Sequence, residues 1–298
     1  MLDLYVFMRE NYGSPLMIEL AKRKRDFLRQ GVTGSICKGF KQRVRDFRLL
    51  ISVVIPCKPT PDSYVDGMSR AKKYREFVFS TLKSINIFPY NITANEFIKT
   101  VAEIINPSHK EDIKHLSWDP KNAIADQLVF SDNITEVYKD YLFLDGKYCR
   151  SFTVRQYPPE WDISSCINYV GDFFETARQI DSIPFFISMN CEHVNPVQTV
   201  SKIKTKALSV GYQAFGPMAK WVPKVAMKKQ EFDKFVMMLE DGASPIYGYL
   251  HIMIYANDLK ELEEYTGQVL TLYRSLGFTL QKDDLIGLPL FLQSIPLG

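Results

Sequence analysis

Cys191 and His193 are the residues whose types and spacing come nearest to a nucleophilic catalytic pair in this chain. They close an apolar run that favours a strand, and residues two apart on a strand share one face. A thiolate beside an imidazole base is the arrangement that cysteine nucleophiles use. No orienting acid or oxyanion hole is recognisable around them. A Cys–His enzyme is therefore the weakest of three functional hypotheses.

The motifs of phosphate and metal chemistry are missing from the sequence. A P-loop requires G-x-x-x-x-G-K-[S/T], whose backbone amides and lysine hold phosphates. The nearest segment, residues 34–39, follows no predicted strand and opens no predicted helix. The five cysteines are odd in number and include no CxxC pair, which argues against a zinc site and a disulfide framework. The four histidines are scattered, so we expect no catalytic, cofactor-binding or metal-binding site.

Positive charge is concentrated in residues 20–50, where ten Lys and Arg face two acids, whereas the whole chain carries a net charge of only +3. Such asymmetry is typical of a surface that contacts nucleic acid or an anionic membrane. A single-stranded nucleic-acid-binding module is therefore the second hypothesis; the alternative is a solvated helix face followed by a flexible loop. The candidate contact residues are Lys22, Arg23, Lys24, Arg25 and Arg29.

Residues 196–241 combine eight lysines with exposed aromatic candidates such as Tyr212. Lysines interleaved with aromatics could neutralise phosphates and stack bases. Amphipathic helices of this kind more often pack against another subunit, and we favour that interpretation. The candidate contact residues here are Lys202, Lys206, Lys220, Trp221 and Lys224.

The first part of the chain, residues 1–125, predicts a strand–helix subdomain with the basic segment. Pro15 suits the first turn of a helix over 15–30, with Gly31 as its C-terminal cap. The β-branched run 46–56 predicts a buried strand. Asp62 or Ser63 would cap a helix over 64–85, and Thr93 with Glu96 forms a capping box for a helix that ends at 105.

Residues 126–290 predict a ferredoxin-like α/β subdomain. Asp145-Gly146 between two apolar runs indicates a β-hairpin over 134–157. Strands at 183–191, 247–255 and 277–283 then alternate with helices at 164–180 and 258–275. Setting aside the helical insertion 196–241, this order is a split βαβ arrangement, with both helices on one sheet face. The fold class is therefore α/β (α+β), with a mixed, largely antiparallel sheet, and residues 291–298 would begin a linker.

Composition fits a folded protein, because 46% of residues are hydrophobic and 24% are charged. No apolar run reaches 18 residues, and the N-terminus lacks a basic region followed by a cleavage site. The sequence thus predicts a chain without a membrane-spanning helix or a secretory signal, located in the cytoplasm.

Three segments, in order, resemble the amino-terminal, non-motor region of TraC-type conjugative-transfer ATPases. They are DFRLLISVVIP (46–56), LDGKYCRSFTVRQYPPEW (144–161) and LKELEEYTGQVLTLYRSLGFTLQKDDLIGLPLFLQSIPLG (259–298). Such proteins belong to the VirB-type assembly ATPases of type IV secretion systems, which energise pilus biogenesis and conjugation.

The resemblance implies a protein peripheral to the bacterial inner membrane. Its partners would be other inner-membrane components of the secretion system and further copies of itself. ATP and Mg²⁺ are implied only for a carboxy-terminal RecA-like domain, which would begin beyond Gly298. The leading hypothesis is therefore a non-catalytic assembly region that docks a motor to its neighbours.

Overall fold

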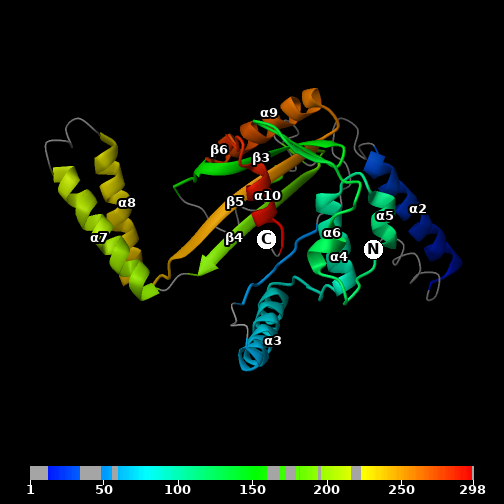
Figure 1. Cartoon of the computed structure of the whole chain (residues 1–298), viewed down its shortest axis with the longest axis horizontal. Coiled ribbons are helices and arrows are strands. Elements are labelled where there is room, and N and C mark those ends of the chain that lie inside the picture. The colour runs from blue at the N-terminus through cyan, green and yellow to red at the C-terminus, as the bar shows by residue number, and fades with distance from the viewer. Residues whose placement is uncertain are drawn as a thin grey trace. The chain divides into compact units, whose positions relative to one another are not determined.

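The computed structural model describes residues 13–33, 48–55, 60–159, 168–171, 179–180, 182–193, 196–215 and 223–296. Figure 1 shows a mixture of helices and strands, which confirms the predicted fold class. The chain divides into two compact units, one of residues 1–188 with 251–298 and the other of residues 189–250. The predicted boundary near residue 125 falls inside the first unit.

The strands are β1 (Thr135–Val137), β2 (Leu142–Leu144), β3 (Lys147–Gln156), β4 (Phe185–His193), β5 (Ile246–Ala256) and β6 (Thr279–Lys282). Their order is β1-β2-β3-β5-β4. β6 also pairs with β3, on the same side of that strand as β2 but further along it. The order β6-β3-β5-β4 matches the split βαβ arrangement that the sequence predicts. β3 pairs antiparallel with both β5 and β6.

The Asp145-Gly146 turn joins β2 to β3 as expected. Asp145 has φ 48° and Gly146 has φ 77°, and two successive positive φ values are those of a type I′ turn. The predicted first arm, however, is not one strand. β1 and β2 pair with each other, and the backbone amide of Tyr138 donates to the carbonyl of Tyr141 at 3.0 Å. The predicted hairpin is therefore a three-stranded meander.

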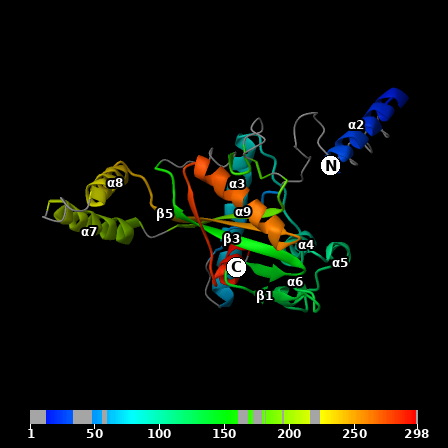
Figure 2. The same ribbon diagram turned by 90° about the horizontal axis from the view of Figure 1, so that it is seen from above.

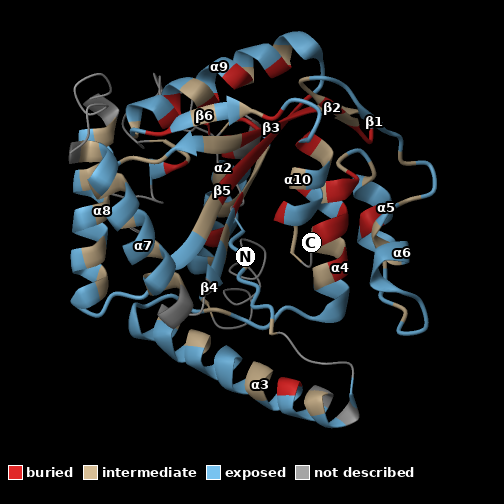
Figure 3. Cartoon of the chain, turned by 60° about the vertical axis from the view of Figure 1, so that its left-hand side comes forward, coloured by how far each residue is buried: buried red, intermediate tan, exposed pale blue. Residues whose placement is uncertain are grey.

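Helices cover both faces of the sheet (Figures 2 and 3). α9 (Leu259–Ser275) begins at Asp258, whose side chain caps Glu261, and buries Leu262 and Val269. Successive strand residues point to opposite faces, and the bond from Arg150 of β3 to Thr266 places α9 on the Arg150 face.

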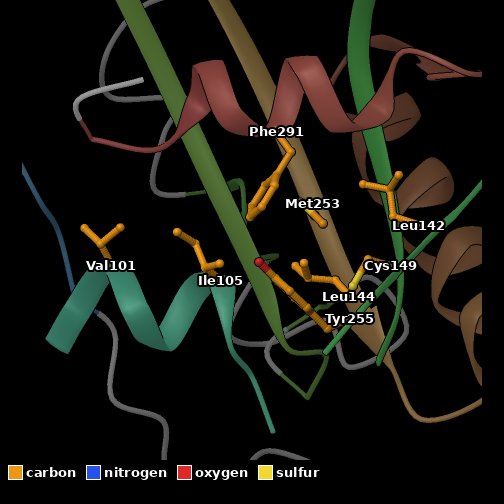
Figure 4. Packing of buried hydrophobic residues seen from close by; sticks show 8 residues of the cluster. All are labelled: Val101, Ile105, Leu142, Leu144, Cys149, Met253, Tyr255 and Phe291. Atoms are coloured by element: carbon orange, nitrogen blue, oxygen red, sulfur yellow. The ribbon is translucent and has the colours of Figure 1, made fainter. Parts of the chain in front are cut away.

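The opposite face packs against α4 (Ala94–Ile105) and α10 (Gly287–Ser294). Figure 4 shows this apolar cluster, in which Val101 and Ile105 of α4 and Phe291 of α10 meet the sheet. The side chains that the sheet contributes are Leu142, Leu144, Cys149, Met253 and Tyr255. Residues 291–298, expected to begin a linker, thus start with a side chain that the core encloses completely.

The other helices in the described part of the first unit are α2 (Pro15–Thr33), α3 (Pro61–Ser84), α5 (Lys110–His115) and α6 (Ile124–Leu128). Thr93 and Glu96 form the predicted capping box of α4. Two predicted boundaries are wrong. Thr60 caps α3 in place of Asp62 or Ser63, because Pro61 occupies the first helical position. α2 continues past Gly31 to Thr33.

The buried strand predicted at 46–56 is also wrong in its described part. Residues 48–55 form neither helix nor strand, and Ile51 and Val54 are 53% and 79% exposed. A strand is stabilised by a hydrogen-bonded neighbour, and no strand pairing involves this segment. Apolar, β-branched composition alone therefore did not place it in the sheet.

The helix predicted over 164–180 is described only at 168–171 and 179–180. Gly171 has φ 110° and forms an antiparallel bridge with Gln179, so these residues do not belong to one continuous helix. Of the two crossover helices predicted on one face of the sheet, the described residues thus show only α9. The rest of that segment lies outside the described residues.

Candidate interaction surface

The second unit contains two long helices, α7 (Pro196–Phe215) and α8 (Pro223–Glu240), in the segment predicted as a helical insertion. They pack side by side, as both views show (Figures 1 and 2). Ile203 and Val210 of α7 and Phe232 and Leu239 of α8 are only half-buried. Among the side chains described in these helices, none is fully buried. Two helices alone do not enclose a core, so the hairpin leaves apolar surface uncovered.

A groove of about 550 Å³ runs between α7 and α8. Its apolar residues include Leu208 and Tyr212 of α7, which are 66% and 81% exposed, and Met237 of α8, which is 65% exposed. Leu208 and Tyr212 lie four residues apart and therefore on one face of the helix. Large, contiguous exposed apolar side chains are typical of an interaction site.

Charged residues border this groove in balanced numbers. Lys204 Nζ lies 2.8 Å from Glu240 Oε1 and links α7 to α8. Lys229 Nζ lies 3.4 Å from Asp233 Oδ2 within α8. The groove is lined by these two lysines and two acids, so it carries no net charge.

The predicted contact lysines do not line the groove. Lys202 and Lys206 are exposed, but each lies two residues from the groove residue Lys204 and therefore about 200° around the helix from it. Lys224 is the second residue of α8, and its side chain lies outside the described residues. Lys220 and Trp221 lie wholly outside them. Tyr212, named from sequence as an exposed aromatic, is confirmed as exposed and lines the groove.

The basic residues predicted near the N-terminus lie on α2. Lys22, Arg23, Lys24 and Arg29 are exposed and Arg25 is half-buried. Arg23 lies 2.5 Å from Glu19, and Arg25 lies 2.9 Å from Asp26. Part of the positive charge on α2 is thus balanced by its own acids.

Cys191 is exposed near the end of β4. The side chain of His193 lies outside the described residues. No geometry for a Cys–His pair follows, and that hypothesis stays a prediction.

A polar cluster around His109 was missed by sequence reasoning. His109 Nδ1 lies 2.8 Å from Asp145 and Nε2 lies 3.0 Å from Asp132. The backbone amide of Ser108 also donates to Asp145, at 2.7 Å. The hydrogen bonds to Asp132 and Asp145 raise the pKa of His109 to about 8. The cluster fixes the β2–β3 turn to the loop after α4. Its residues are far apart in sequence, so no local sequence pattern predicts it.

A second missed cluster lies under the start of α10. The Asp283 carboxylate accepts hydrogen bonds from Ser151 and Thr153, each at 2.8 Å. His251 is 1% exposed, and burial lowers its pKa to about 4. Serine bonds to the aspartate rather than to the histidine, whose Nε2 lies 3.7 Å from Asp283. This arrangement ties β6 to β3 and does not activate a nucleophile.

Arg150 is a buried polar residue on the α9 face. It donates to the carbonyl and carboxylate oxygens of Asp140 at 2.9 Å and to Thr266 at 2.8 Å, and it lies 2.7 Å from Glu263. One guanidinium thus joins the β1–β2 turn, β3 and α9. Its donors are used in structural contacts.

Two further features of the described part of the chain bear on other kinds of site. No group of three or more potential metal ligands occurs there. Of the helices in the same residues, none combines the length and the apolar composition that crossing a bilayer requires.

Comparison with known proteins places the chain in a family. A comparison with curated proteins gives no match. A family model described as TraC protein matches residues 2–298, and the match agrees with the resemblance seen in segments 46–56, 144–161 and 259–298. The chain therefore belongs to the TraC family of conjugative-transfer proteins.

Proposed function

We propose that this chain is a non-catalytic assembly region of a type IV secretion ATPase, in which the α7–α8 hairpin is a docking surface. The observation that carries the proposal is that this hairpin exposes Leu208, Tyr212 and Met237 in one groove. Burying such side chains stabilises association by about 25 cal/mol for each Å² of apolar surface removed from water. The sheet of the first unit would serve as the rigid platform, acting at the cytoplasmic face of the inner membrane.

The proposal assigns no chemistry to this chain. The sequence contains no P-loop, and the hydrogen bonds of Arg150 and Asp283 link elements of the fold. The purified chain should therefore show no ATP turnover above a matched blank. Turnover that persists through repurification and disappears on substituting a residue of this chain would contradict this part of the proposal.

The docking role is tested by conjugative transfer in donor cells whose only copy of the gene carries Leu208→Glu. A buried, unpaired carboxylate in an interface is costly, so transfer should fall by at least about tenfold while the protein accumulates normally. Ser209→Glu is the matched control, because Ser209 is exposed on the same helix but does not line the groove. Equal transfer by both variants and the wild type would refute the docking role.

A further inference from the structure

We infer that the occupant of the α7–α8 groove is the same groove of a second copy of this chain. The inference rests on the proposed docking function and names its partner. In each hairpin the two helices run antiparallel. Two such hairpins that meet groove to groove would form a four-helix bundle, in which each helix has two antiparallel neighbours.

The first argument is burial. Leu208 and Tyr212 on one wall and Met237 on the other are mostly exposed in a single copy. A two-fold axis that runs along the groove lays α7 of one copy over α8 of the other. Leu208 and Tyr212 of each copy then face Val236 and Met237 of its partner, and one set of residues covers itself, as in isologous dimers.

The second argument is space over Gly211, a groove residue in the interior of α7. Glycine inside a helix costs about 1 kcal/mol relative to alanine. A Cβ at this position would meet no atom within 4 Å, so packing within one copy does not require the glycine. An approaching helix would use the open space, since the missing side chain lets the partner come closer.

The third argument is charge. The same two-fold axis brings Lys204 of one copy over Glu240 of the other, and Glu240 over Lys204, so this end of the groove is complementary to itself in charge. Nucleic acid and anionic membranes attract surfaces of net positive charge, and this groove has none. The exposed Lys202 and Lys206 lie on the far face of α7 and do not change this balance.

Sedimentation of the full chain over a range of concentrations tests the inference. The wild type should associate to a dimer, and Met237→Glu should weaken association by at least about tenfold. Met238→Glu is the matched control, because Met238 is 51% exposed on α8 but does not line the groove. Far-UV circular dichroism confirms that both variants keep their helices.

A charge swap separates contacts between copies from contacts within one copy. Lys204→Glu and Glu240→Lys each place like charges together in a homodimer, so each variant alone should remain monomeric at concentrations where the wild type associates. An equimolar mixture restores both cross-copy pairs, although each chain still lacks its internal pair. Recovery of dimers on mixing supports the inference.

Two results would overturn it: a wild-type chain that stays monomeric, or a mixture that associates no better than its components. If Leu208→Glu still impairs conjugative transfer in that case, the groove docks another protein, so only the identity of the occupant fails. If transfer is also unaffected, the docking function itself fails.

Discussion

The sheet of the first unit and the helical hairpin of the second use apolar side chains in opposite ways. The sheet encloses Cys149, Phe152 and Met253 completely between helices on both faces. The hairpin, in its described part, encloses no side chain and leaves methionines, a leucine and a tyrosine in contact with water. The sheet is thus covered on both faces within one copy, whereas the hairpin exposes the surface that we propose as a docking site.

The largest effect is expected from removing Phe291, because it lies wholly inside the sheet core. Phe291→Ala should reduce the free energy of unfolding by about 3–5 kcal/mol, the usual cost of such a cavity. Leu292→Ala is the matched control, since Leu292 is 46% exposed on the same helix. Urea unfolding measures both variants, and equal effects would break the comparison.

Arg150→Met should follow, with a loss of about 3 kcal/mol. It removes the buried guanidinium that joins the β1–β2 turn to α9, and breaking such a buried pair is costly. Arg274→Met, at an exposed position of α9, should change the unfolding midpoint little. A stable Arg150 variant would mean that packing alone holds these elements together.

The His109 cluster should give a smaller, pH-dependent effect. The pKa of the His109 ring is about 8 in the folded chain and about 6.5 in an unfolded chain. Folding therefore favours the protonated ring. The stability that His109 adds over His109→Gln should be fully present below about pH 6.5 and lost as pH rises through about 8. Unfolding of both proteins at several pH values measures this difference; a constant difference would contradict the assignment.

The smallest effect on stability is expected in the hairpin. Tyr212→Ala should change the unfolding free energy of the monomer by less than about 0.5 kcal/mol, because the ring is largely in water. Thermal unfolding is measured at protein concentrations too low for the chain to associate. A loss comparable with that of Phe291→Ala would show that the hairpin is already covered in one copy.

The elements that sequence predicted well are those whose signals are local. Asp145-Gly146 requires a tight turn wherever it lies, and Thr93 with Glu96 completes a capping box within four residues. The strand at 46–56 failed because pairing depends on a partner distant in sequence. The same holds for Ser151 and Asp283, which are 132 residues apart and meet only in the fold.

The groove lies within residues 196–241, where the sequence predicts an interaction surface, but its lining, among the described residues, includes none of the predicted contact residues. Lys202 and Lys206 were chosen for their charge, although they lie on the face of α7 opposite the groove. The spacing of Lys204, Leu208 and Tyr212, each four residues apart, marks the groove face at helical period. Residue type selects the lysines, whereas helical periodicity selects the residues that line the groove.

Hydrogen–deuterium exchange tests the central claim most directly. The amides of α7 and α8 are compared in dilute, isolated chain and in the transfer assembly purified from donor cells. The account predicts that residues 196–215 and 223–240 gain protection in the assembly, while β3 and β5 are equally protected in both states. Unchanged exchange in the hairpin would contradict its role as the docking surface.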